Sequence, residues 1–248
     1  LYIELLNETY RTSEYETFTI YEPKERLISR LPCRDRVIHH AIMNVMEDIW
    51  VSVFIANTYS CIETRGIHGV LRHLNGDLKN IPGTTYCLKL DITKFYPSVD
   101  HNIMKNILRK KIKDVKLLNL LDGIIDSAPG LPIGNYLSQF LANLYLTYFD
   151  HWLKEDKQAK YYYRYADDIV ILDSDKQRLH DLFGEIRNYL HVNLRLQVKG
   201  DYQVFPVKAR GIDFVGYVFR HRPIFMRKSS KVRLCKQAAK LNKKDISV

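Results

Sequence analysis

The chain has 248 residues, 46% of them apolar, which is enough for a sizeable core in one large domain or in two to three subdomains. No apolar run approaches the roughly 20 residues that a membrane-spanning helix needs, and no leader segment follows Leu1. The four cysteines are scattered and form no CxxC pair, so we expect neither a zinc site nor a disulfide framework, and we expect a reducing, cytoplasmic location.

The net charge of +10 is concentrated near the C-terminus. Residues 201–248 hold 12 Lys and Arg against 3 Asp, whereas the first 200 residues hold 26 basic and 25 acidic side chains. Such a basic segment is expected to face a phosphate backbone, although charged runs are more often solvated surfaces. Residues 229–241 have the spacing of an amphipathic helix. We interpret it as facing nucleic acid, with these residues toward the backbone: Arg227, Lys228, Lys231, Arg233, Lys236 and Lys240.

Hydrophobic periodicity predicts helices and short strands in a mixed order. The predicted strands, in chain order, are 18–21, 26–29, 86–90, 161–165, 169–172, 194–198 and 204–206, with a closing hairpin of 214–220 and 224–227. The predicted helices are a short one within 1–10, then 35–53, 69–78, 99–111, 115–125, 137–153 and 176–190. Because βαβ regularity is absent, we expect an α+β fold with an antiparallel sheet.

Two adjacent carboxylates, Asp167 and Asp168, lie between the apolar, β-prone runs 161–165 and 169–172. This pattern predicts a hairpin with an acidic tip. Adjacent carboxylates raise each other's proton affinity and so favour a bound cation, and hard oxygen ligands suit Mg²⁺ or Mn²⁺. The alternative is a solvated turn, because Asp is common in turns.

A third carboxylate, Asp91, ends the alternating run 86–90, whose alternation predicts a strand with Lys89 and Asp91 on one side. Five residues further on stands an aromatic residue, Tyr96. An Asp at a strand end followed by such an aromatic is the arrangement of a polymerase palm, and here the chain resembles reverse transcriptases. The resemblance implies that Asp91 and the acidic hairpin lie on adjacent strands and hold two metal ions about 4 Å apart.

The resemblance extends from about residue 15 to residue 240. It rests on the blocks 21–36, 58–69, 88–101, 130–150, 161–172 and 210–217. It implies a right-hand polymerase fold of the α+β class, with fingers at 1–85 and a palm at 86–225. A helical insertion at about 102–130 would contribute to the fingers, and 226–248 would be the beginning of a truncated thumb.

The resemblance also implies roles for individual residues near the metals. Asp91, Asp167 and Asp168 would hold two Mg²⁺ or Mn²⁺ ions, with the carbonyl of Ile92 as a further ligand. Tyr96 would be a steric gate against a 2′-hydroxyl group, although aromatic core packing is the alternative interpretation.

Other residues would hold the substrates. Lys24 and Arg26 of a fingers hairpin, and less strongly Arg36, would bind the nucleotide triphosphate. Lys199 would be a general acid for pyrophosphate. The primer grip would be Phe214, Val215, Gly216 and Tyr217.

The block from Gly130 to Gln139 points to one branch of the family. Many reverse transcriptases carry Gln at Ile133 and Pro at Gln139, whereas the form found here, with Gly134 between them, resembles enzymes of diversity-generating retroelements. Ile133, Gly134 and Gln139 would lie beside the nucleotide. Because the apolar side chain of Ile133 cannot form a hydrogen bond, we expect lower fidelity, particularly opposite template adenines.

The resemblance implies partners: a structured template RNA, a DNA or RNA primer, dNTPs and a basic pentameric accessory protein, in a bacterial or phage setting. The alternatives are an antiphage-defence, retron or group II intron-type reverse transcriptase. A further alternative of another class is a nucleic-acid-binding module on a polymerase scaffold without useful catalysis.

Overall fold

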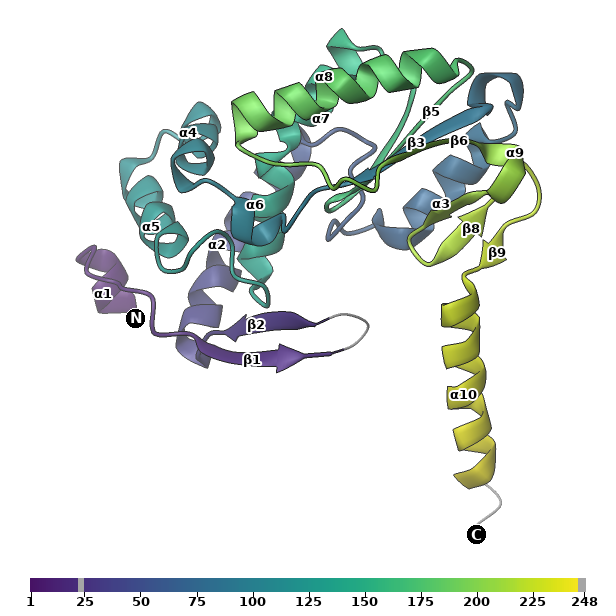
Figure 1. Ribbon diagram of the computed structural model, residues 1–248. Helices are drawn as coiled ribbons and strands as arrows, with labels where there is room; N and C mark the ends of the chain where they lie inside the picture. Colours follow the sequence, from purple (N-terminus) through teal and green to yellow (C-terminus); the bar gives the residue numbers. More distant parts are fainter. Residues whose placement is uncertain (22–24, 245–248) are drawn as a thin grey trace.

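The computed structural model describes residues 1–21 and 25–244, with side chains through residue 240. Its helices are α1 (Tyr2–Leu6), α2 (Cys33–Val53), α3 (Gly66–Asp77), α4 (His101–Lys111), α5 (Val115–Ile125), α6 (Tyr136–Tyr145), α7 (Thr147–His151), α8 (Lys176–Leu194), α9 (Val207–Arg210) and α10 (Lys228–Lys244). Its strands are β1 (Glu16–Ile20), β2 (Arg26–Arg30), β3 (Tyr86–Asp91), β4 (Tyr161–Tyr165), β5 (Asp168–Asp173), β6 (Gln203–Pro206), β7 (Ile212–Phe214), β8 (Tyr217–Phe219) and β9 (Phe225–Met226). Figure 1 shows their arrangement.

The central sheet has the strand order β4–β5–β3–β6, and its neighbouring strands are antiparallel, as the sequence predicts. Both faces are covered. Leu88 and Leu90 of β3 point into one core with residues of α8, whereas Cys87 points into a second core with α3 and with the β7–β8–β9 sheet. Figure 1 shows α8 above the sheet and α3, β8 and β9 below it. The alternation along β3 therefore sends its polar face, Lys89 and Asp91, to the same side as Cys87.

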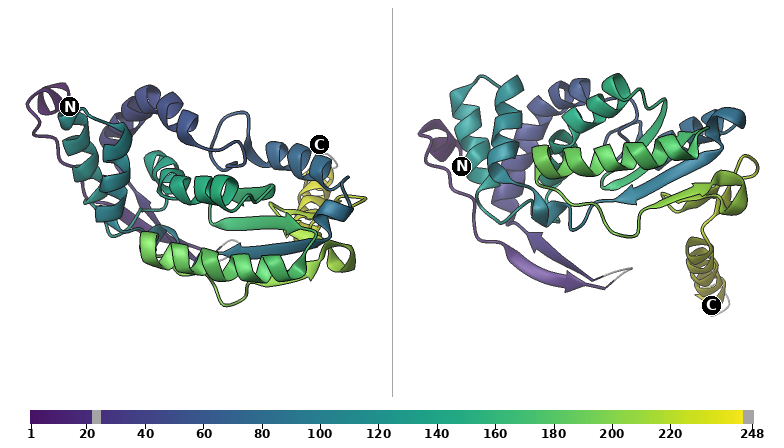
Figure 2. Two further views of the ribbon diagram at one scale, coloured as in Figure 1. Left: turned by 90° about the horizontal axis from the view of Figure 1, so that it is seen from above. Right: turned by 45° about the horizontal axis from the view of Figure 1, so that its top comes forward.

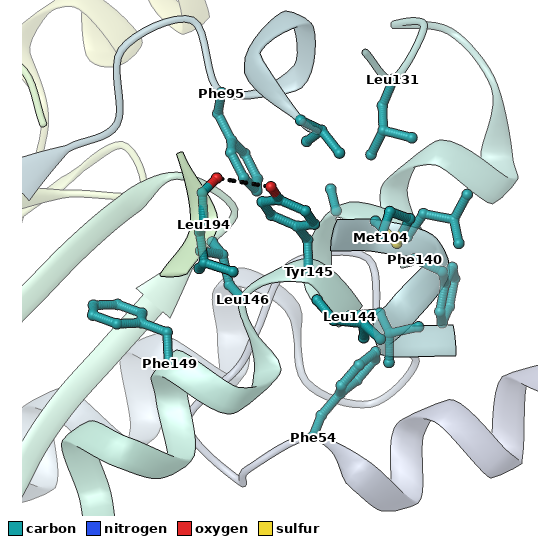
Figure 3. Close-up of a cluster of buried hydrophobic side chains, with 14 of the residues drawn as sticks. Phe54, Phe95, Met104, Leu131, Phe140, Leu144, Tyr145, Leu146, Phe149 and Leu194 are labelled. Atoms are coloured by element: carbon teal, nitrogen blue, oxygen red, sulfur yellow. Dashed lines mark hydrogen bonds between the residues drawn. The ribbon is translucent and has the colours of Figure 1, made fainter. Parts of the chain in front are cut away.

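A helical body of α2, α4, α5 and α6 continues the first core away from the sheet. Its centre is α6, in which nearly every side chain is buried. Tyr145 of α6 lies among these apolar side chains, and its hydroxyl donates to the carbonyl oxygen of Leu194 at 2.7 Å (Figure 3). This hydrogen bond joins the helical body to the end of α8, and the same hydroxyl also accepts from the Asp100 amide at 3.2 Å.

Two elements project from this body. In Figure 1 the β1–β2 hairpin extends below the helical body at one end, and α10 extends below the β7–β8–β9 sheet at the other end. Both views of Figure 2 show the same separation. Among the helices of the described residues, none combines the length and hydropathy that a membrane crossing requires.

The single helix predicted over 137–153 is wrong in its continuity. The chain forms α6, then α7 after Leu146, and then a π-helical turn at Trp152–Asp156. The Asn143 carbonyl accepts side-chain hydrogen bonds from Thr147 Oγ1 at 3.1 Å and from Arg164 Nη2 at 3.4 Å. Side chains that compete for a helix carbonyl in this way bend helices, and apolar periodicity does not reveal them.

The strand predicted over 194–198 is also wrong. The helix α8 continues through Leu194 and ends at Arg195, which has a positive φ of 52°. Beyond it the chain makes one isolated bridge, between Ile92 and Val198. The closing hairpin predicted at 214–220 and 224–227 is present as β8 and β9, but Phe214 belongs to an additional strand, β7. The apolar Leu194 and Leu196 are buried in the core, which explains their strand-like alternation.

Candidate active site

Three carboxylates meet at one end of the central sheet. Asp91, the last residue of β3, lies opposite Asp168, the first residue of β5, in the antiparallel register. Tyr165 and Asp168 are paired, so Ala166 and Asp167 form the two-residue turn that joins β4 to β5. The register therefore confirms the predicted hairpin and its position on a strand adjacent to that of Asp91.

Two lysines are paired with two of these carboxylates. Lys199 Nζ forms an ion pair with Asp91 Oδ2, and the Lys199 amide donates to the Asp91 carbonyl oxygen at 2.9 Å. Lys89 Nζ lies 3.6 Å from Asp168 Oδ2 and also donates to the backbone carbonyl of Asp213. The four paired side chains are between 25% and 34% exposed, so water screens their charges only in part.

The chemistry of the three carboxylates fits a divalent cation. Oδ1 of Asp91 and Oδ1 of Asp168 are buried and have no hydrogen-bond partner among the described residues. Burial, and then the charge of Asp91, raises the pKa of Asp167 to about 6. Burial raises the pKa of Asp168 to about 6, although the charge of Lys89 lowers it. Desolvated, mutually repelling carboxylates favour a cation with hard oxygen ligands.

The carboxylates are not already assembled around an ion position. Within residues 1–21 and 25–244, no group of three or more His, Cys, Asp or Glu side chains is arranged as a metal cluster. Asp91 and Asp168 are turned toward Lys199 and Lys89 instead. A bound cation would therefore have to replace the lysines as the partner of these carboxylates, whose side chains are about one third exposed.

Space for a substrate lies beside the carboxylates. A cavity of about 540 Å³ is lined by Asp91 and Asp168 and extends past Asp213 to Arg227.

The bridge that follows β3 uses the Asp91 carbonyl and the Thr93 amide, which leaves the carbonyl of Ile92 outside that ladder. The Ile92 carbonyl, which the sequence predicts as a metal ligand, is therefore not used in the bridge.

The turn after β3 is fixed against the loop that begins at Gly130. The Leu131 amide donates to the Tyr96 carbonyl at 2.8 Å. Gly130 has a φ of 60°, and a Cβ atom there would lie 2.5 Å from the same carbonyl oxygen, so only glycine fits. Tyr96 is half-buried and packs edge-on against Phe95, and burial raises its pKa, with a further contribution from the charge of Asp167. Tyr96 is therefore within electrostatic range of the acidic turn.

The loop at Ile133 and Gly134 is tied to the β1–β2 hairpin. The Ser29 amide donates to the Ile133 carbonyl at 2.8 Å, and a Cβ atom on Gly134, whose φ is 122°, would lie 2.9 Å from the Ser29 carbonyl oxygen. Ile133 is half-buried, as is Gln139 in the first turns of α6. Ile133 and Gly134 therefore lie where the hairpin meets the helical body.

Two of the residues expected to bind triphosphate, Arg26 and Arg36, are exposed. Arg26 begins β2 and Arg36 lies near the start of α2, and neither makes an ion pair with a described residue. Lys24 lies outside the described residues. Both arginines keep their donors available for an anion.

The predicted primer grip divides into a core part and a surface part. Phe214 is fully buried in the second core. Val215 and Gly216 form the β7–β8 turn, with φ values of 44° and 87°, and Tyr217 is half-buried after it. The Arg227 side chain donates to Asp213 Oδ1 at 2.6 Å, and its amide donates to the Gly216 carbonyl at 2.9 Å. Arg227 thus joins the start of α10 to this turn.

The remaining basic residues predicted to meet nucleic acid lie on α10. Every residue from 231 to 240 is exposed. The predicted set on this helix is Lys228, Lys231, Arg233, Lys236 and Lys240.

The sequence interpretation missed two residues that contact the carboxylate site. Lys89 lies two residues before Asp91, on the same face of β3, and this period-2 spacing was the available signal. Arg164 is fully buried in an otherwise aromatic strand and donates to the Ala166 carbonyl at 3.1 Å. A lone charged residue at an inward strand position was the signal for a buried ion pair.

Comparison with known proteins identifies the family. A sequence profile described as "Reverse transcriptase (RNA-dependent DNA polymerase)" matches residues 21–219. The chain belongs to the reverse transcriptase family.

Relatives with printed names support the same family. The chain is 24% identical to Protein YkfC of Escherichia coli over 87% of this chain and 70% of that protein. It is 25% identical to the group II intron-encoded protein LtrA of Lactococcus lactis, over 50% of this chain but only 22% of LtrA. It is 29% identical to nuclear intron maturase 4 of Arabidopsis thaliana, over 47% of this chain and 16% of the maturase.

Solved structures share the fold. Telomerase from Candida tropicalis, in complex with a fragment of telomeric RNA, matches with a TM-score of 0.69 and 13% identity. The match covers 89% of this chain and 45% of that chain, so this reverse transcriptase spans less than half the length of the telomerase. The predicted polymerase fold of the α+β class is thereby confirmed.

Proposed function

We propose that this protein copies an RNA template into DNA by nucleotidyl transfer at Asp91, Asp167 and Asp168. The observation that supports this most directly is the pairing of Asp91 with Asp168 across adjacent strands, each with a buried oxygen that has no partner. Asp91 and Asp168 would bridge two Mg²⁺ or Mn²⁺ ions, with Asp167 and the Ile92 carbonyl as further ligands. Such ions activate the primer 3′-hydroxyl and stabilise the charge that develops on pyrophosphate.

The surrounding residues have separate tasks. Lys199 forms an ion pair with Asp91. When Asp91 binds an ion instead, Lys199 would be free to donate a proton to the departing pyrophosphate. Tyr96, fixed by its carbonyl to Leu131, would present its ring to the sugar and exclude a 2′-hydroxyl group. Lys24 and Arg26, with Arg36 as the weaker candidate, would bind the triphosphate.

The larger elements fit the three parts of a polymerase hand. The fingers would comprise residues 1–85, and the palm would comprise 86–225 with the α4–α5 insertion assigned to the fingers. The thumb would begin with α10. The template and primer would then lie between the two projecting elements, with Phe214, Val215, Gly216 and Tyr217 at the primer end.

The test is primer extension on an RNA template with Mg²⁺ and dNTPs, using Asp168→Ala as the matched variant. Extension by the wild type and none by the variant is the expected result. Extension by Asp168→Ala would contradict the proposed site. An RNA-bound but inactive wild type, with or without an accessory protein, would favour the binding-module alternative.

For the branch of the family, we propose an error-prone enzyme of a diversity-generating retroelement, working with a structured template RNA and a basic pentameric accessory protein. The supporting residues are Ile133 and Gln139, which stand where many relatives carry Gln and Pro. The test replaces Ile133 with Gln, because a restored amide can hydrogen-bond near the nucleotide sugar. Fewer misincorporations opposite template adenine are expected, and an unchanged error spectrum would contradict the idea.

A group II intron-type enzyme is the second candidate, and the named relatives favour it. LtrA and maturase 4 are intron proteins by name, and each aligns over about half of this chain. Binding to a group II intron RNA with higher affinity than to other structured RNA of equal length would favour this candidate over the first.

A further inference from the structure

The turn that carries Asp167 is strained. Tyr165 pairs with Asp168, so Ala166 and Asp167 are the two central residues of a tight hairpin. Ala166 has a φ of 55°, whereas Asp167 is not among the residues with positive φ. Two-residue turns with positive φ at the first central position usually have glycine there, because a Cβ atom disfavours the left-handed region. Something other than local preference must hold Ala166 in place.

Arg164 supplies a direct hold on this turn. Its guanidinium is fully buried, and Nη1 donates to the Ala166 carbonyl at 3.1 Å. The same nitrogen donates to Asn143 Oδ1 at 3.0 Å. The rest of the fork is bidentate on Asp150: Nε is 2.8 Å from Oδ1 and Nη2 is 2.6 Å from Oδ2. Because Asp150 and Asn143 fix the planar guanidinium, its Nη1 donor favours one orientation of the Ala166 carbonyl.

The partner carboxylate is itself fixed. Asp150 is fully buried and accepts hydrogen bonds from the Tyr162 hydroxyl at 2.5 Å and from Thr58 Oγ1 at 3.2 Å. The backbone of Arg164 is clamped as well, because its amide donates to the Asn57 carbonyl and its carbonyl accepts from the Tyr59 amide, both at 3.1 Å. The guanidinium therefore reaches the catalytic turn from an anchor that spans α7, β4 and the segment after α2.

Stability alone does not account for this arrangement. A buried ion pair contributes little net stability, because desolvation of both charges offsets their attraction, and apolar residues of similar volume often replace such pairs without loss. What apolar residues cannot supply is a donor aimed at the Ala166 carbonyl. That carbonyl belongs to the peptide group whose nitrogen is the backbone nitrogen of Asp167.

We propose that Arg164 is a positioning residue for nucleotidyl transfer. By holding the Ala166 carbonyl, it keeps the strained turn in the conformation that brings Asp167 and Asp168 to the end of β3, beside Asp91. This rests on the proposed role of these two carboxylates as metal ligands. Asp150 acts through Arg164, and neither side chain touches the substrate.

The test compares the full chain with the double variant Arg164→Met/Asp150→Leu, which removes both charges and keeps an apolar core. We expect kcat for primer extension to fall about 100-fold, the effect of misplacing reacting groups by about 1 Å. The KM for dNTP should stay near the wild-type value, whereas the melting temperature should fall, because the buried hydroxyls of Tyr162 and Thr58 lose their acceptor. Mn²⁺ binding, measured by electron paramagnetic resonance without substrate, should weaken.

A third substitution separates positioning from general damage. Ala166→Gly in the double-variant background should recover much of the lost kcat and Mn²⁺ affinity, because glycine adopts positive φ without a hold on its carbonyl. The matched control is Arg109→Met/Asp122→Leu, which removes the ion pair between α4 and α5 and should leave both readouts unchanged. If the double variant does not fold, Arg164→Lys replaces it, because Lys keeps the charge but cannot contact Asp150 and Ala166 together.

Wild-type kcat and wild-type Mn²⁺ binding in the double variant would overturn the proposal. A loss that Ala166→Gly leaves uncorrected would overturn it too, since the turn would then not be what Arg164 supports. Failure of the proposed function gives a different result, namely an Asp168→Ala variant as active as the wild type or as able to bind Mn²⁺.

Discussion

The carboxylate end of the central sheet and the helix α10 are built in opposite ways. Asp91 and Asp168 stand at the ends of strands whose central residues are mostly buried, next to an anchor of fully buried polar side chains. Residues 231–240 of helix α10 are all exposed, and the helix projects from the body (Figure 1). This difference agrees with the roles proposed for the two regions: reacting groups would have to be fixed by a core, whereas contact with a phosphate backbone would need only accessible charge.

The largest effect is expected at the carboxylates. Asp168→Ala should lower primer extension by at least about a thousandfold, because a ligand that stabilises charge in the transition state contributes several kcal/mol. Its melting temperature should not fall, because Asp168 is desolvated by burial and repelled by Asp91 and Asp167 in the folded state. Extension assays and thermal melts in EDTA check the two parts. A large drop in melting temperature would mean that the site is structural.

A second prediction concerns the anchor below the site. Asp150→Asn leaves Arg164 buried with no carboxylate partner, which should reduce the free energy of unfolding by about 3–5 kcal/mol. The matched control is Asp122→Asn, since Asp122 pairs with an Arg109 side chain that is 42% exposed. An exposed pair should lose less than about 1 kcal/mol. Urea unfolding of both variants measures the difference, and equal losses would remove the contrast between buried and exposed pairs.

A third prediction tests the accessible charge of α10. Lys231→Gln/Lys236→Gln should weaken binding to a primer–template duplex about tenfold and reduce the slope of log K against log salt by about 2. Neither kcat nor the melting temperature should change, because both side chains are exposed.

The control for α10 is Lys111→Gln/Lys113→Gln, which removes two exposed charges at the end of α4. It should alter binding much less, because α4 lies away from α10 (Figure 1). Equal weakening by the two double variants would mean that net charge, rather than the position of α10, decides affinity.

The residues of the carboxylate site differ in how far the sequence predicts them. The period-2 alternation of β3 and the acidic pair after an aromatic strand predicted the strand and the hairpin, and the family resemblance predicted that they are adjacent, which the pairing of Asp91 with Asp168 confirms. The partners of these residues were not predictable in the same way. Lys199 was found through the family resemblance, whereas Arg164 and Asp150 are 14 residues apart in sequence and meet only when α7 packs on β4.

The errors have the same physical origin. The break after α6 depends on Thr147 and Arg164 donating to one helix carbonyl, and the Arg164 contact is tertiary. The segment after Leu194 alternates like a strand because Leu194 and Leu196 both reach the core, although no neighbouring strand is there to pair with it beyond one bridge. Local patterns predict burial more reliably than they predict partners.

The smallest effect is expected at the β7–β8 turn, where a non-glycine residue again has a positive φ in a tight hairpin. Val215 has a φ of 44° and precedes Gly216 at 87°, the pattern of a type I′ turn, in which Asn-Gly is preferred and a β-branched residue is unfavourable. Val215→Asn should therefore stabilise the protein by about 1 kcal/mol, or about 2–4 °C in melting temperature. Unlike Ala166, whose carbonyl Arg164 holds, Val215 compensates its strain only by partial packing on the second core. A melting temperature below that of the wild type would show that this packing outweighs the backbone strain.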